Sequence, residues 1–192
     1  MGLDSPFVAV RPAFREYAEP SFLPGRPLLE AVADLNERIY REFKYDPHFT
    51  TVATPLDEVL SERRGVCQDF AHLAIACLRS LGLAARYVSG YILTVPPPGR
   101  PRLVGADASH AWLSVFVPGL GWADFDPTND LLPDLQHVTL AWGRDFSDIS
   151  PLRGVILGGG EQKIDVRVTV EPIDAPASKS PPPDASLQPA GD

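Results

Sequence analysis

Cys67 stands where a glycine turn leads into an apolar helix, within residues 64–72 (RGVCQDFAH). The first turn of a helix carries unsatisfied N–H groups and the positive end of the helix dipole, and both favour an anion. Thiolate rather than thiol is the nucleophile, so this position favours a reactive cysteine. The sequence therefore predicts a cysteine enzyme, provided that a histidine and an orienting carboxylate reach Cys67 in the fold.

Candidates for both groups follow Cys67 along the chain. His110 begins one predicted strand, and Asp126 ends the next. The turn at 118–121 makes these strands adjacent, so the two side chains can meet across the ladder. Asp124 is the rival carboxylate, because it shares the strand parity of Asp126. The order is consistent with a Cys-His-Asp triad of Cys67, His110 and Asp126.

The elements that would position these groups change character along the chain. Apolar residues that recur every three or four positions predict helices over 27–43, 55–62 and 67–81. Shorter apolar or alternating runs predict strands over 85–93, 110–117, 122–126, 138–142, 153–157 and 162–172. Helices first and strands afterwards indicate an α+β domain, with a helical layer against a largely antiparallel sheet.

Length and composition limit the classes of protein to consider. The chain has 192 residues, which suits one domain with a substantial core. Its net charge of −8 argues against a nucleic-acid partner. We see no signal-peptide pattern and no apolar run of membrane-spanning length, so we expect a cytoplasmic protein. Cys67 and Cys77 lie on one predicted helix, too far apart to pair, and free thiols fit a reducing compartment.

Several neighbours of the candidate triad have ordinary structural interpretations. Cys77 lies on the apolar side of its helix and is expected in the core. Helical geometry turns His72 away from Cys67, and Asp69 is expected to cap local N–H groups. For a developing oxyanion, the backbone N–H of Cys67 is a better donor than the Gln68 side chain.

Three aromatic residues allow two interpretations. Trp112, Trp122 and Tyr91 either line a substrate groove or fill the core, and we expect core packing for at least Trp122. The chain lacks CxxC, HExxH and comparable ligand pairs. We therefore expect neither a metal ion nor an organic cofactor.

Four segments together resemble the bacterial transglutaminase-like superfamily: residues 65–72 (GVCQDFAH), 85–91 (ARYVSGY), 110–112 (HAW) and 126–129 (DPTN). The resemblance implies a papain-like fold. It also implies that Cys67 is the nucleophile, that His110 acts as general base and then acid, and that Asp126 orients His110. The domain is expected over 26–172, with an extended lead-in over 1–25 and a disordered tail over 173–192.

The same resemblance implies a cysteine-dependent acyl transfer on amide bonds of a protein or peptide substrate, through a thioester. We favour peptidase- or amidase-type hydrolysis. The alternative is a transglutaminase that crosslinks glutamine side chains to amines. A second alternative is a catalytically silent protein-binding module on the same fold. Many bacterial relatives carry a β-rich domain before this core, whereas only the segment 1–25 precedes it here.

Overall fold

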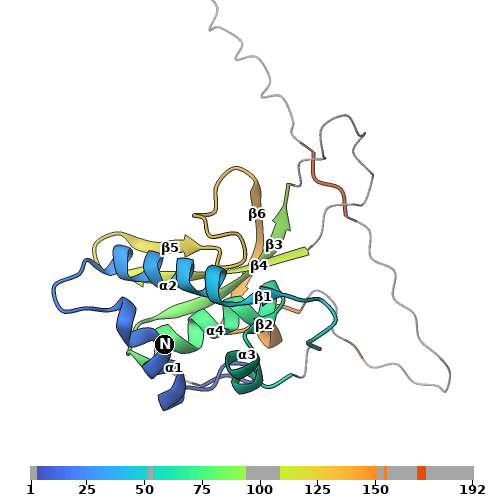
Figure 1. The fold of residues 1–192 in the computed structure, drawn as a ribbon. Helices are drawn as coiled ribbons and strands as arrows, with labels where there is room; N and C mark the ends of the chain where they lie inside the picture. The colour runs from blue at the N-terminus through green and yellow to red at the C-terminus, as the bar shows by residue number, and fades with distance from the viewer. Residues whose placement is uncertain (1–3, 52–53, 94–108, 151–153, 155–167, 172–192) are drawn as a thin grey trace, which may run out of the picture.

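The computed structural model describes residues 4–51, 54–93, 109–150, 154 and 168–171 (Figure 1). The helices come first along the chain: α1 (Pro12–Ala18), the 3-10 turn η1 (Glu19–Ser21), α2 (Leu28–Glu42), α3 (Leu56–Glu62) and α4 (Cys67–Ser80). The sheet strands follow: β3 (Ala85–Ile92), β4 (Ser109–Val117), β5 (Gly121–Phe125) and β6 (His137–Gly143), then the 3-10 turn η2 (Phe146–Asp148). This order confirms the α+β class.

The four strands form one antiparallel sheet in the order β5-β4-β3-β6. Helix α4 packs on β4 and β3, and α1, α2 and α3 pack in turn on α4. The middle of α4 is consequently buried on all sides, with Leu73, Ile75 and Leu78 fully inaccessible to solvent. The chain thus fixes α4, whose first residue is Cys67, against the strand that carries His110.

Most predicted elements agree with the structure to within two residues. The expected lead-in over 1–25 is wrong as an extended segment, because it contains α1 and η1. Phe14, Tyr17 and Ala18 recur at helical spacing, and all three are buried. Pro12 suits the first turn of this short helix. Short length and high proline content hid this periodicity in the sequence.

Two other differences concern strands. The strands β1 (Lys44–Tyr45) and β2 (Arg64–Gly65) were not predicted, and they pair in parallel as a separate two-stranded sheet. The strand predicted over 153–157 and the tail over 173–192 lie outside the described residues, apart from residue 154, as does most of the strand predicted over 162–172.

Trp122 is not a core residue, contrary to expectation. It is 37% exposed, whereas Trp112 is fully buried. The guanidinium of Arg86 lies over the Trp122 ring at 4.2 Å and over the Trp142 ring at 4.4 Å. Trp122 therefore covers a charged side chain at the surface of the sheet, which explains why an aromatic residue remains partly exposed.

Gly90 of β3 makes a close approach that no side chain would allow. A Cβ atom there would lie 2.6 Å from Cη2 of Trp112 and would also collide with the Val138 carbonyl of β6. The pairing of β3 with β6 shifts register between Ser89 and Gly90. The missing side chain lets the buried tryptophan and the neighbouring strand both close on this position.

His72 is the acceptor in a buried cluster that joins the segment around Phe7 to the start of η2. Its Nε2 accepts the backbone N–H of Phe146 at 3.1 Å, and its ring stacks on Phe7 at 5.8 Å. Asp145 accepts the backbone N–H of Phe7 at 2.8 Å. Burial lowers the pKa of His72 to about 4. His72 is therefore neutral and structural, which confirms the interpretation from its helical position.

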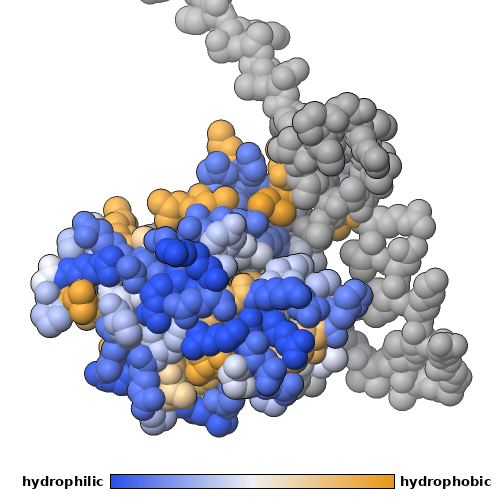
Figure 2. Space-filling view, viewed as in Figure 1, coloured by the Kyte–Doolittle hydropathy of each residue, from blue (hydrophilic) through white to orange (hydrophobic). Residues whose placement is uncertain are grey.

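The surface is mainly hydrophilic over the helices, and apolar side chains gather over the segment between β5 and β6 (Figure 2). Exposed leucines of that segment include Leu132 and Leu135. Within the described ranges, no helix combines the length and the apolar character that crossing a bilayer requires.

Candidate active site

Cys67 is the first residue of α4 and is half-buried. Asp69 fixes this helix start, since its Oδ2 accepts the Val66 N–H at 2.8 Å and the Thr50 hydroxyl at 2.7 Å. A Cβ atom at Gly65 would lie 2.8 Å from the same Oδ2. Burial raises the pKa of Asp69, although its two donors oppose that rise. Asp69 therefore caps local N–H groups as expected, and the glycine makes room for it.

His110 enters the site from the start of β4. Its Nε2 lies 2.7 Å from Oδ2 of Asp126, which follows β5 directly. The Cys67 side chain is a second hydrogen-bond partner of the His110 ring. Because Nε2 is directed at Asp126, Nδ1 is the ring nitrogen left for the sulfur. The structure thus brings together the three residues that the sequence singled out.

Asp126 is fully buried, and each of its oxygens accepts more than one hydrogen bond. Oδ1 accepts the backbone N–H groups of Thr128 at 2.9 Å and Asn129 at 3.3 Å. Oδ2 is within hydrogen-bond distance of three side-chain nitrogens: His110 Nε2 at 2.7 Å, Asn129 Nδ2 at 2.7 Å and His137 Nε2 at 3.1 Å. Such a set of donors favours the ionised carboxylate.

The electrostatics of the pair follow from these contacts. Burial alone would lower the pKa of His110, but hydrogen bonds to Asp126 and Cys67, and their negative charges, raise it to about 9. Burial alone would raise the pKa of Asp126, but its hydrogen bonds and the charge of His110 hold that pKa below its usual value. His110 is therefore an imidazolium at neutral pH, next to an ionised Asp126.

The rival carboxylate has a different task. Asp124 Oδ2 accepts the indole N–H of Trp112 at 3.2 Å, and its Oδ1 accepts the hydroxyl of Ser114. Both partners are buried residues of β4, and they lie further along that strand than His110. The structure therefore separates the two acids that strand parity could not separate, with Asp126 next to His110.

Sequence reasoning missed two residues of this site. Asn129 belongs to the segment DPTN, and its place in the turn after Asp126 was the available signal. Its amide lies 2.7 Å from Asp126 Oδ2 and 3.4 Å from His110 Nε2. His137 gave no signal beyond its position before the predicted strand 138–142. The fold brings it to Asp126 from β6, the strand at the opposite edge of the sheet from β5.

A cavity of about 290 Å³ opens over Cys67. Its walls combine the two candidate reacting side chains with aromatic rings from three elements: Cys67, Gln68, Tyr45, Tyr87, His110 and Phe146. Tyr45 is 53% exposed at this cavity. The backbone N–H of Cys67 belongs to the first turn of α4, where N–H groups have no partner within the helix. The cavity therefore offers room for a reacting carbonyl beside an oxyanion donor.

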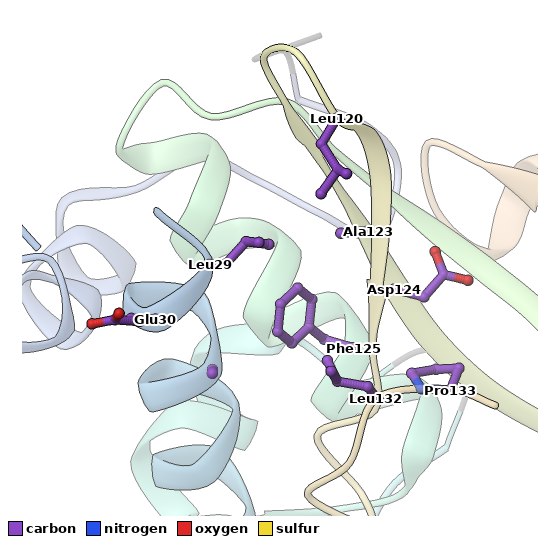
Figure 3. A pocket seen from close by; sticks show the side chains of 9 residues that line it. Leu29, Glu30, Leu120, Ala123, Asp124, Phe125, Leu132 and Pro133 are labelled. Atoms are coloured by element: carbon purple, nitrogen blue, oxygen red, sulfur yellow. The ribbon is translucent and has the colours of Figure 1, made fainter. Parts of the chain in front are cut away.

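A larger cavity, of about 530 Å³, lies between α2 and β5. Figure 3 shows Leu29 of α2 and Phe125 of β5 directed into this space, while the Asp124 carboxylate points away from it. Its lining is mainly apolar and includes no cysteine or histidine. The larger cavity thus contains none of the three residues of the candidate triad.

A metal ion would find one group of ligands among the described residues. His110, Asp126 and His137 each offer one ligand atom, and these atoms lie within 4.8 Å of one another. Nε2 of each histidine lies within hydrogen-bond distance of Oδ2 of Asp126, so hydrogen bonds already join the three side chains.

Comparison with known proteins agrees with this architecture. The model of the Transglutaminase-like superfamily matches residues 15–127. Uncharacterised proteins of Mycobacterium tuberculosis and Mycobacterium bovis are 54% identical over 170 residues, 86% of this chain and 54% of theirs. The chain thus spans about half the length of these curated relatives.

A solved structure shares the fold. A candidate cysteine protease from Cytophaga hutchinsonii superposes with a TM-score of 0.64 at 30% identity, over 78% of this chain and 47% of that one. The α+β architecture seen here is accordingly the papain-like fold expected from the sequence. On the family model, the relatives and the shared fold, the chain belongs to the transglutaminase-like superfamily.

Proposed function

We propose that the protein is a cysteine-dependent enzyme that cleaves amide bonds of a protein or peptide substrate through a thioester. The observation that carries this proposal is the position of the His110 ring, which lies 2.7 Å from buried Asp126 and also contacts the Cys67 side chain. Contacts with buried Asp126 and with Cys67 raise the pKa of His110 to about 9, so a cation faces the sulfur at neutral pH. A neighbouring cation favours thiolate, the nucleophilic form of cysteine.

The reaction follows from these groups. The thiolate of Cys67 attacks the amide carbonyl carbon, and the new oxyanion accepts the backbone N–H of Cys67. His110 then gives its proton to the departing nitrogen, the C–N bond breaks, and an amine and a thioester remain. In the second half, neutral His110 takes a proton from water, and hydroxide attacks the thioester. The acid departs and Cys67 returns as thiolate beside the imidazolium.

Asp126 acts through His110 in both halves. Its Oδ2 holds Nε2 of the ring and thereby presents Nδ1 to the sulfur. The ionised carboxylate also stabilises the imidazolium that precedes proton transfer. Asp126 is therefore the orienting residue of the proposed triad.

Hydrolysis is favoured over transfer to an amine. The Cytophaga hutchinsonii relative is described as a candidate cysteine protease, and it is 30% identical to this chain. A crosslinking transglutaminase would use the same three residues and differ only in the second nucleophile. A silent binding module has no need for a histidine held charged beside a cysteine, which makes it the weakest of the three.

The test is to incubate the protein with a library of glutamine-containing peptides, with and without a primary amine, and to analyse the products by mass. We expect cleaved or deamidated peptides in both cases, and no activity in Cys67→Ala. Amine adducts as the main product would support the transglutaminase instead. Full activity in Cys67→Ala would overturn the proposal.

A further inference from the structure

We infer that His137 is a positioning residue for the proposed triad: it holds the Asp126 carboxylate in place from the far edge of the sheet. The inference rests on the proposed function, because it assigns His137 a task in activating Cys67. Nε2 of His137 lies 3.1 Å from Oδ2 of Asp126, so this oxygen has a second imidazole partner that the triad does not require.

The path of the chain explains why Asp126 needs this contact. Asp126 follows β5, at one edge of the sheet, and His137 begins β6, at the other edge. The segment between them crosses the end of the sheet and rises above it (Figure 1). The bond from His137 to Asp126 closes this crossing segment onto β6. Without it, the carboxylate is held by its own turn and by His110 alone.

Hydrogen-bond chemistry sets the form of His137. Asp126 is ionised, so its Oδ2 can only accept, and Nε2 of His137 must donate. Nδ1 of His137 is buried and has no hydrogen-bond partner within the described part of the chain. Oδ1 of exposed Asp134 lies 3.8 Å from this atom, too far for a hydrogen bond. His137 therefore carries a proton on Nε2, the ring nitrogen that faces Asp126.

Packing keeps the His137 ring in this orientation. Its side chain is 2% exposed, and its ring meets the fully buried Trp112 edge-on at 5.2 Å. The His110 ring lies 5.8 Å from the His137 ring and 6.0 Å from that of Trp112. Both imidazoles of this ring cluster lie within hydrogen-bond distance of Oδ2 of Asp126. A rigid donor in this place limits rotation of the carboxylate away from His110.

The inference is tested by the rate of Cys67 alkylation with iodoacetamide at about pH 6 and about pH 10. At the higher pH every accessible thiol is ionised, so that rate reports access to Cys67 and the integrity of the fold. The ratio of the two rates reports activation by His110. We expect His137→Leu to lower this ratio about tenfold, because Asp126 loses a donor. His137→Gln, whose amide can donate from nearly the same place, should restore the ratio to within about threefold.

The exposed His48 gives the control: it is not among the hydrogen-bond partners of Asp126 in the described part of the chain, so His48→Leu should leave the ratio unchanged. A wild-type ratio in His137→Leu would overturn the inference while leaving the proposed function intact. A wild-type protein without low-pH reactivity would instead contradict the proposed function.

A second measurement needs only the wild-type chain. Nitrogen-15 chemical shifts of the histidine rings distinguish the two neutral tautomers. We expect His137 to carry its proton on Nε2 at neutral pH. A proton on Nδ1 would leave no donor for Asp126 and would overturn the inference.

Discussion

Replacing Asp126 by asparagine removes one charge and changes almost no volume, yet it should change His110 profoundly. The two backbone N–H groups of the turn, from Thr128 and Asn129, still require an acceptor at the Oδ1 position. The amide oxygen of the variant therefore takes that position, and its NH₂ group takes the place of Oδ2. There it faces the side-chain donors of His110, Asn129 and His137, so donors meet a donor.

The magnitude follows from the structure. The rise of the His110 pKa from 6.5 to about 9 corresponds to about 3 kcal/mol in favour of imidazolium, a factor of about 300. In Asp126→Asn, burial still acts to lower the pKa, and Cys67 alone opposes it. We expect the pKa of His110 to fall by about two pH units, so that roughly half of the molecules carry a neutral ring at pH ~7, where nearly all wild-type molecules carry imidazolium.

The assay is an NMR titration of the His110 ring protons in the wild type and in two variants. Asp124→Asn is the matched control, because Asp124 bonds Trp112 and Ser114 rather than His110. The pKa of His110 should stay near 9 in that control. If Asp126→Asn also left it there, the carboxylate would not be the source of the shift, and our account of the site would be refuted.

Two further predictions concern stability. The pKa of His72 is about 4 in the folded chain and 6.5 when unfolded. The free energy of unfolding should therefore fall as pH falls between these two values. Urea titrations should show this decrease in the wild type, and His72→Phe should lose that part of the pH dependence. An unchanged slope in the variant would mean that another group causes it. Gly90→Ala should lower the free energy of unfolding by about 1–3 kcal/mol, because its Cβ would collide with Trp112. In the control Gly154→Ala the new Cβ meets no atom, so stability should not change. Equal denaturation midpoints for the two variants would contradict the packing argument.

Local patterns predicted much of this fold, since most of its elements are decided by their own apolar periodicity. Helix α4 shows this well: its apolar residues and the glycine turn before it placed both the helix and Cys67 at its start. Helix α1 was missed because it spans Pro12–Ala18 only and its three buried residues give too short a pattern. The parallel pairing of β1 with β2 was missed for a similar reason, as each has two residues.

Residues of the candidate site were likewise predictable where a local pattern marks them, and not where their contacts depend on distant strands. Cys67, His110 and Asp126 were found because each stands at the end of a recognisable element, and a turn joins the two strands. The burial of Trp112 and the exposure of Trp122 were not predictable, because both depend on Arg86 and Gly90 of a different strand. The role of His137 could not be predicted for the same reason, because its contact with Asp126 depends on how the chain crosses the end of the sheet.

The central claim is that His110 activates Cys67, and the pH dependence of Cys67 alkylation tests it most directly. The rate constant with iodoacetamide would be measured by mass spectrometry from acid to alkaline pH, in the wild type and in His110→Ala. Cys77 is an internal reference, because burial raises the pKa of its thiol to about 12. We predict that the rate at about pH 6, relative to the rate at about pH 10, is at least about tenfold higher in the wild type than in His110→Ala, because only the wild type holds an imidazolium beside the sulfur. Equal ratios in the two proteins would contradict the account.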